Sequence, residues 1–134
     1  MQYLATSTHS VNADQLIHQL KAGFPVESFD DLRKRLDLSD NSLAKIVQIP
    51  RRTLSRRRVN GRFNTAESER VLRLTQVYEM AAEVFGSSEK ARRWLKKPAR
   101  GLGGRIPLEY ADTYIGANEV IKLLGRIDHG VFPG

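Results

Sequence analysis

Apolar residues recur every three or four positions along most of this chain, the spacing that places them on one face of an α-helix. No segment of useful length alternates apolar and polar residues as a β-strand does. The pattern therefore predicts an all-α fold. The longest predicted helix runs from Thr65 to about Phe85, has Thr65 and Ser68 as possible caps, and carries Val71, Leu74, Tyr78, Ala81 and Phe85 on one stripe.

Four short helices are predicted ahead of the long one, and the first two are marked by their ends. Asn12 is the expected N-cap of a helix over 13–22, and Gly23 ends that helix. After a Phe24-Pro25 turn, Ser28 is the expected cap of the second helix. The apolar face of this second helix consists of Phe29, Leu32 and Leu36.

The third and fourth helices are separated by a tight turn. Ser39 is the expected cap of the third helix, which runs through Val47 and has the small Ala44 where two helices can approach closely. Pro50 begins the fourth helix, where its missing N–H costs nothing, and Asn60-Gly61 ends it. The side chains predicted to face inward are Leu43, Ile46 and Val47.

The C-terminal third predicts further short helical segments. Gly86 ends the long helix, Ser87 or Ser88 caps the next one, and that helix ends before Pro98 with Trp94 and Leu95 in the core. A glycine-rich turn over 101–104 and one helical turn over 107–110 follow. The last helix is predicted over 117–128, with Val120, Leu123, Leu124 and Ile127 on one face.

Composition adds a strongly basic balance to this helical picture. The 134 residues include 22 Lys and Arg against 15 Asp and Glu, a formal net charge of +7. Residues 51–62 hold six arginines and no acid, and residues 86–105 hold seven cations and one acid. Such a balance favours a polyanionic partner.

Cysteine usage and hydropathy narrow the expected location. The chain has no cysteine, which excludes disulfides and thiolate metal sites and favours a reducing cytoplasm. Its polar N-terminus has no apolar segment typical of a secretory signal. No apolar run approaches the roughly 20 residues that span a bilayer, so we expect no membrane association and a cytoplasmic protein.

The segment from Asp40 to Val59 predicts a helix-turn-helix, the element with which many small proteins read double-stranded DNA. Gln48 occupies the place where many such motifs have a glycine with positive φ. Leu54 is placed to pack the second helix against the first. Clustered arginines on that second helix fit a major groove, where guanidinium groups meet phosphates and guanine edges.

Side chains on the arginine-rich helix are assigned by their distance from its N-terminus, where base contacts are usually made. The residues expected nearest the bases are Arg51, Arg52 and Thr53. One turn on, near bases or phosphates, are Ser55, Arg56 and Arg57. The expected phosphate clamps are Arg58 and Arg62. For each arginine the alternative is a phosphate-only or solvent-facing role. The footprint of one such domain is small, so dimeric binding to an inverted repeat is the usual route to specificity.

A second set of motifs lies in the C-terminal third. Trp94 to Pro98 reads W-L-x-x-P, residues 102–109 read L-G-G-x-x-P-L-E, and residues 113–131 read T-x-x-G-x-x-x-V-x-x-L-L-G-R-I-x-x-G-V. This combination resembles the C-terminal toxin-binding domain of the MbcA/ParS/Xre antitoxin family. Residues 51–57 and 69–74 resemble the helix-turn-helix half of the same family, and the resemblance covers about residues 28–132.

The resemblance implies the antitoxin of a type II toxin–antitoxin system. Its expected partner is a RES-domain toxin that acts on NAD, whose active site the antitoxin covers with its C-terminal region. The same antitoxin is expected to repress its own operon by binding double-stranded operator DNA, as a homodimer within a hetero-oligomeric complex with the toxin. Carried over by position, the toxin-facing candidates are Arg126, Asp128, His129, Val131 and Phe132. An alternative is that Phe132 folds back on the bundle while Arg126 pairs with Asp128 or Glu119.

These features predict a domain order and no enzymatic activity. We expect a flexible N-terminus over 1–12, a helix-turn-helix region over 13–64, a long connecting helix over 65–86 and a toxin-binding domain over 87–134. The three histidines, His9, His18 and His129, lack ligand spacing, so we expect no metal, no cofactor and no catalytic residue.

Two other functions remain open from the sequence. One is a stand-alone helix-turn-helix transcription regulator whose C-terminal domain only dimerises. The other is a non-specific nucleoid or RNA-binding protein that uses both basic blocks. The patterned C-terminus argues against the second.

Overall fold

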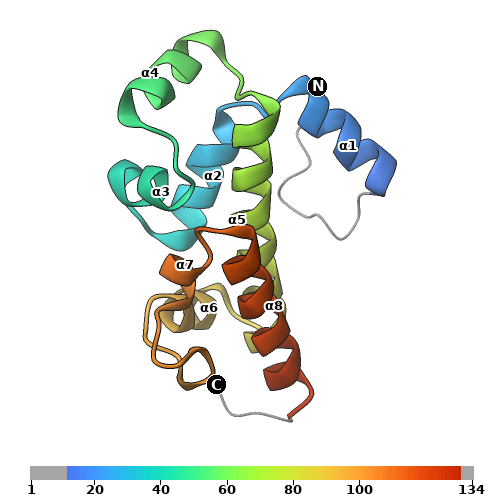
Figure 1. Ribbon diagram of the computed structural model, residues 1–134, viewed down its shortest axis with the longest axis vertical. Coiled ribbons are helices and arrows are strands. Elements are labelled where there is room, and N and C mark those ends of the chain that lie inside the picture. Colours follow the sequence, from blue (N-terminus) through green and yellow to red (C-terminus); the bar gives the residue numbers. More distant parts are fainter. Residues whose placement is uncertain (1–11, 131–134) are drawn as a thin grey trace. The chain divides into compact units, whose positions relative to one another are not determined.

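The computed structural model describes residues 12–130, and those residues are helical throughout apart from short connections, as predicted (Figure 1). The elements are α1 (Ala13–Ala22), α2 (Glu27–Leu36), α3 (Asp40–Ile46), α4 (Arg51–Asn60), α5 (Thr65–Phe85), α6 (Ser88–Leu95), the 3-10 turn η2 (Arg100–Leu102), α7 (Pro107–Tyr110) and α8 (Tyr114–Asp128). Within 12–130 the only extended pairings are two isolated bridges. None of the helices in that range is both long and apolar enough to cross a membrane.

The chain divides into two compact units whose boundary falls inside the long helix α5. Unit 1 is Met1–Thr75 and unit 2 is Gln76–Gly134. The N-terminal half of α5 therefore belongs to the same unit as α1 to α4, and its C-terminal half belongs with α6 to α8. The flexible segment expected over 1–12 lies outside the described residues except for Asn12.

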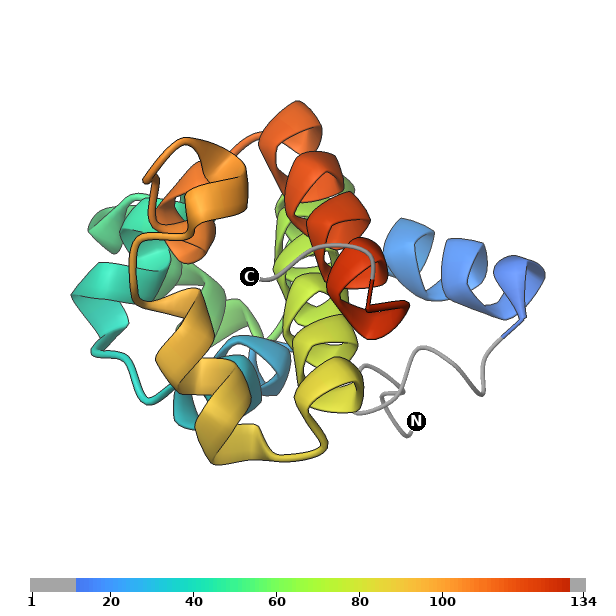
Figure 2. The same ribbon diagram turned by 90° about the horizontal axis from the view of Figure 1, so that it is seen from below.

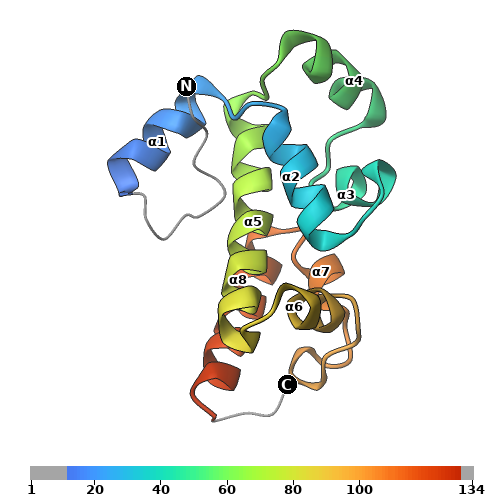
Figure 3. The ribbon, with the colours of Figure 1, turned by 180° about the vertical axis from the view of Figure 1, so that it is seen from behind.

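Unit 1 packs α2, α3 and α4 against the first half of α5, while α1 lies to one side of them (Figures 1 and 3). Backbone bonds join the start of α2 to the end of α4: the Val26 N–H donates to the Gly61 carbonyl over 2.9 Å, and the Phe63 N–H donates to the Phe24 carbonyl over 2.9 Å. The largest fully buried side chains of this unit are Phe24, Phe29, Leu32, Leu36, Leu43, Ile49, Val71 and Leu74.

The predicted ends of α1 and the predicted end of α4 at Asn60-Gly61 are confirmed, whereas Pro50 precedes α4 and does not begin it, and α3 ends at Ile46, one residue before the predicted Val47. Asn12 caps α1 and Ser39 caps α3 through their side-chain oxygens. Two predicted N-caps are wrong. Ser28 is not a cap: α2 begins one residue earlier, after Val26, and the Ser28 side chain is fully buried inside it. Neither Thr65 nor Ser68 caps α5. Asn64 does, because its side chain accepts from the Glu67 N–H while Glu67 accepts from the Asn64 N–H.

Unit 2 surrounds the second half of α5 with α6, α7 and α8; Figure 2 shows α8 beside that half of α5. Ser87 caps α6, and the predicted single turn over Pro107–Tyr110 is present as α7. Trp94 is half-buried, not a full core residue, and its ring lies 5.7 Å from that of Phe85. The buried side chains of the unit include Val77, Ala81, Leu95, Leu102, Leu108, Val120, Leu123 and Leu124.

The last helix begins one turn earlier than the sequence predicted. α8 starts at Tyr114, with Thr113 as its N-cap accepting from the Gly116 N–H over 3.0 Å. Gly116 lies so close to α7 that an added Cβ would sit 1.7 Å from the Tyr110 carbonyl oxygen. The junction between α7 and α8 is therefore tight, and it fixes the first turn of α8 beside α7.

Candidate functional site

The tight turn between α3 and α4 has the backbone of a helix-turn-helix. Gln48 adopts φ +56°, the left-handed conformation that many such motifs give to a glycine. The Ile49 N–H donates to the Ala44 carbonyl over 2.9 Å, which closes the turn. From α5, the Arg70 Nε donates to the Val47 carbonyl over 2.7 Å. These contacts fix where α4 starts relative to α3.

One face of α4 points to solvent and is strongly basic. Leu54 is the buried residue of this helix and anchors it to the unit 1 core. Arg51, Arg52, Ser55 and Arg56 are exposed. No hydrogen bond or ion pair engages their side chains within the described part of the chain. Three guanidinium groups and one hydroxyl are therefore accessible to solvent. We call these four residues the exposed α4 face.

Arg57 lies on the opposite side of α4 and pairs with a buried carboxylate. Its Nε and Nη2 donate to the two carboxylate oxygens of Glu67 over 2.8 and 3.1 Å. Burial would raise the pKa of Glu67. The hydrogen bonds from Arg57 and the Asn64 N–H and the charges of Arg57 and Arg70 outweigh it, and they hold that pKa below its ordinary value. This geometry joins α4 to the first turn of α5.

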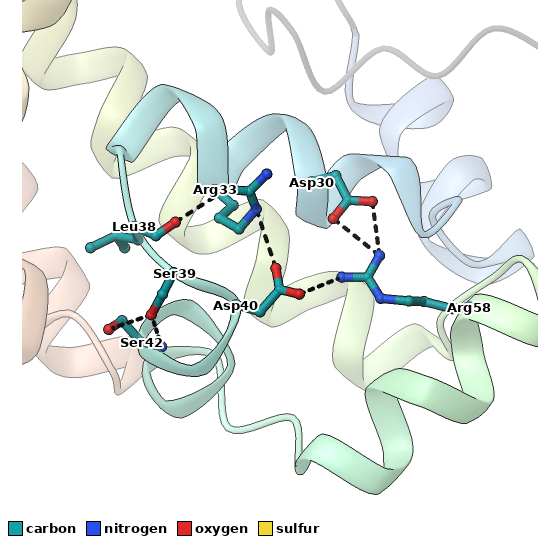
Figure 4. Close-up of polar contacts among 7 residues, drawn as sticks. All are labelled: Asp30, Arg33, Leu38, Ser39, Asp40, Ser42 and Arg58. Atoms are coloured by element: carbon teal, nitrogen blue, oxygen red, sulfur yellow. Dashed lines mark hydrogen bonds and ion pairs between the residues drawn. The ribbon is translucent and has the colours of Figure 1, made fainter.

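Arg58 belongs to an ion network that ties α4 to the two preceding helices (Figure 4). Its Nη1 lies 3.0 Å from Asp30 of α2, and its Nη2 lies 3.2 Å from Asp40 of α3. Asp40 in turn accepts from Arg33 over 3.2 Å. The hydrogen bond to Asp30 raises the pKa of Arg58 further above its ordinary value. Two carboxylates thus offset the charge that Arg58 could offer to a phosphate.

The remaining two DNA candidates also differ from the exposed α4 face. The Arg62 Nη1 donates to the Gly23 carbonyl over 2.7 Å, and Thr53 is half-buried. The structure therefore brings Arg51, Arg52, Ser55 and Arg56 onto one open surface. Arg57, Arg58 and Arg62 instead have contacts that shape the element, and their DNA roles remain predictions.

Sequence reasoning did not single out Glu67 or Arg70, although both position the helix-turn-helix. Glu67 stands three residues after Asn64, the capping-box spacing, and this signal could have identified it. Arg70 has no comparable signal, because its bonds to the backbone of the turn depend on the tertiary packing of α5 against α3.

The structure describes three of the five toxin-facing candidates, which lie at the end of α8. Arg126, Asp128 and His129 are exposed, and the His129 Nδ1 lies 2.7 Å from the Gly125 carbonyl oxygen in the last helical turn. Val131 and Phe132 lie outside the described residues. Within the described range, no group of three or more His, Cys, Asp or Glu could hold a metal ion.

Both units match known protein families. The description "Antitoxin Xre-like helix-turn-helix domain" applies to residues 15–75, and "Antitoxin Xre/MbcA/ParS C-terminal toxin-binding domain" applies to residues 80–130. These two ranges fall on either side of the boundary between the compact units.

Curated relatives extend the likeness over most of the chain. A protein of Yersinia enterocolitica named "Antitoxin Xre" is 39% identical over 87% of this chain and 80% of its own length. One of the same name from Photorhabdus laumondii is 37% identical over 84% of this chain and 77% of its own length. A Sphingobium protein named "Prs ADP-ribosylating antitoxin" is 26% identical over 84% of this chain and 77% of its own length. On this likeness, with an open basic face on its helix-turn-helix and a separate C-terminal unit, the chain belongs to the Xre family of antitoxins, non-enzymatic regulators with a DNA-binding and a toxin-binding domain.

Proposed function

We propose that this chain is the antitoxin of a type II pair whose toxin is a RES-domain enzyme that degrades NAD. Its C-terminal region covers the active site of the toxin, and its helix-turn-helix represses the operon that encodes both. The observation that best supports this proposal is that one chain combines the two matched domains, each in its own compact unit. The name of the Sphingobium relative supports the NAD part, since ADP-ribosylation consumes NAD.

For operator binding we assign the exposed α4 face. Its three arginines lie within the first six residues of α4, where a recognition helix reaches base edges and flanking phosphates. If all three engage phosphates, the logarithm of the binding constant falls with the logarithm of salt at a slope of about −3 per helix-turn-helix. A homodimer on an inverted repeat doubles that slope. In this proposal Arg57, Arg58 and Arg62 contribute by holding α4 in place.

The DNA part is tested by replacing two members of the exposed α4 face. Arg52→Ala with Arg56→Ala should weaken binding to the DNA upstream of the gene by about tenfold or more, because each removes a direct contact. Toxin neutralisation in the same cells should remain intact. Unfolding midpoints should equal those of the wild-type chain, since neither side chain has a partner within residues 12–130.

Arg57→Ala is the matched control for this experiment. It removes one positive charge from the same helix, but it also breaks the bond to Glu67, so it should lower the unfolding midpoint. If the Arg52 and Arg56 double variant loses neutralisation together with DNA binding, the proposed division of labour between the two units is wrong.

The toxin part is tested by co-expression with the product of the neighbouring gene. Growth arrest by that gene alone, rescue by this chain and co-purification of the two proteins are the expected results. Cellular NAD should fall during arrest and recover on rescue. Absence of both toxicity and complex would leave a helix-turn-helix regulator without a toxin partner.

A further inference from the structure

Unit 2 has an open groove at the glycine turn that none of the toxin-facing candidates lines. The groove has a volume of about 360 Å³ and is lined by Pro98, Gly104, Arg105, Ile106, Glu109 and Tyr110. Its apolar surface comes from a proline, an isoleucine and a tyrosine ring. Its polar surface comes from one guanidinium and one carboxylate.

The backbone that forms this groove is fixed by its own hydrogen bonds. The Gly104 N–H donates to the Ala99 carbonyl over 3.0 Å, and the Ala99 N–H donates to the Arg105 carbonyl over 3.0 Å. Gly103 and Gly104 have φ values of +66° and +84°, which L side chains rarely adopt. The turn is therefore preformed, and a ligand would not have to order it.

The Arg105 side chain of the groove is held as well. The Arg105 Nη1 donates to the Leu102 carbonyl over 3.0 Å, and its guanidinium carbon lies 5.2 Å from the centre of the Tyr110 ring. An arginine that is already held over a tyrosine ring loses little further conformational entropy when it binds a partner. Arginine and tyrosine are also the residue types enriched where protein interfaces gain most of their affinity.

Two large apolar side chains are exposed on the turn of α8 that follows α7. Tyr114 is 72% exposed and Ile115 is 73% exposed, on the first turn of α8. Gly116 contacts the Tyr110 carbonyl so closely that this turn must lie beside α7 and its groove. We define the α7–α8 surface as this groove together with Tyr114 and Ile115. Adjacent exposed apolar residues of this size mark interaction sites more often than isolated ones do.

The charge around this surface selects the chemistry of its partner. Residues 96–105 contain Lys96, Lys97, Arg100 and Arg105 and no acid, against Glu109 and Asp112 on the following segment. Lys97 and Arg100 are exposed. A second copy of this chain would bring these cations against their own counterparts, whereas an acidic segment would complement them.

We propose that the α7–α8 surface docks an acidic segment of the cognate toxin, with an apolar side chain of that segment seated against Tyr114 and Ile115. This inference rests on the proposed function of unit 2 and adds a second contact region to the end of α8. The groove anchors the toxin, while the C-terminal end of the chain covers its active site.

Binding between the purified toxin and full-length antitoxin variants tests the proposal. Tyr114→Ala with Ile115→Ala should raise Kd by about tenfold or more, the effect of removing an interface anchor. Lys97→Glu with Arg100→Glu should raise Kd and also flatten the dependence of Kd on salt. Ile17→Ser is the matched control, since Ile17 is 47% exposed on α1 in unit 1 and should leave Kd unchanged.

The outcomes separate this inference from the proposed function. A wild-type chain that binds no toxin removes the proposed function and the docking site with it. Toxin binding by the wild-type chain, with an unchanged Kd for both double variants, would overturn the docking site alone. An unchanged Kd combined with a shift in the sedimentation of the antitoxin by itself would assign the surface to contacts between copies and equally overturn it. The charge variants lie on exposed positions, so they keep the test valid if the apolar double variant fails to fold.

Discussion

Gly116 is required by a close approach of two backbones. A Cβ at this position would sit 1.7 Å from the Tyr110 carbonyl oxygen and 3.1 Å from the Thr113 hydroxyl. Backbone cannot move aside as a flexible side chain can. The need for glycine here thus comes from tertiary packing and not from backbone conformation.

We predict that Gly116→Ala destabilises unit 2 by about 2 kcal/mol or more, because α7 and α8 must separate to admit the methyl group. Gly125→Ala is the matched control in the same helix, where an added Cβ meets nothing within 4 Å. It should stabilise the protein by about 0.5–1 kcal/mol through helix propensity. Urea unfolding of both variants measures the difference, and equal effects would contradict the close approach.

Glu67 makes the stability of unit 1 depend on pH. The folded state holds the pKa of this carboxyl below its ordinary value, so the unfolded chain binds the proton more readily. Its stabilising contribution is therefore complete above the unfolded pKa of about 4.3 and is lost as pH falls through that value toward the lower folded pKa.

We predict that Glu67→Gln is less stable than the wild-type chain at neutral pH and that this difference shrinks as the solution is acidified. Unfolding in urea at a series of pH values provides the measurement. Glu69→Gln, an exposed carboxylate on the same helix, should show no such convergence. Parallel curves for Glu67→Gln and the wild-type chain would mean that the Arg57 pair adds nothing to folding.

Individual N-caps were predictable where a serine directly precedes the first residue of a helix and its side chain stays outside the core. Ser39 and Ser87 fit that rule. Ser28 has the right residue type, but α2 already begins at Glu27, so Ser28 lies inside the helix and its side chain is fully buried beside Phe29 in the core. The partners of Arg57 and Arg58 could not be predicted from the sequence, because these partners are carboxylates distant in the sequence that only the folded chain brings close.

At the scale of elements, the turn of the helix-turn-helix carries conformational strain. Gln48 has a side chain in a region of φ that costs most residues about 1 kcal/mol. The packing of Ile49 and Leu54 and the bond from Arg70 hold it there.

We predict that Gln48→Gly stabilises the protein by about 0.5–1 kcal/mol, since glycine adopts this conformation without a steric cost. The control is Lys45→Gly, an exposed position inside α3, which should destabilise by about 1 kcal/mol. Thermal unfolding compares the two. A loss of stability in Gln48→Gly would show that the glutamine side chain contributes more than its backbone costs.

Helices were predictable as elements because their buried stripes have a regular period. The exception is the start of α8, because its first two residues are not part of the row of buried apolar residues that indicates a helix. Tyr114 and Ile115 are exposed there, and Gly116 between the stripe and the cap suggests a loop. The same unusual composition that hid this turn is what makes it a candidate docking surface.

For the whole molecule, the two units predict two separable activities. Truncation after Ile127 removes four of the toxin-facing candidates while leaving every residue of unit 1 in place; the four are Asp128, His129, Val131 and Phe132. We predict that this variant loses toxin neutralisation and keeps the operator affinity of the wild-type chain. Growth assays and DNA binding provide the two readouts.

Removing only Pro133 and Gly134 is the control for this truncation and should preserve both activities. Continued protection by the longer truncation would exclude the C-terminal end as the inhibitory element. In that case the α7–α8 surface would have to supply the neutralising contact.

The division of α4 into an outer and an inner side has a consequence for how such proteins diversify. The side chains of the exposed α4 face contribute no hydrogen bond or ion pair within residues 12–130, so replacing them with other helix-forming residues leaves the scaffold undisturbed. If this face binds the operator as proposed, the DNA sequence that it prefers can change independently of the fold. Under this proposal, related toxin–antitoxin pairs in one genome keep distinct operators through substitutions at these four positions, and the same positions are the ones to change in an engineered regulator.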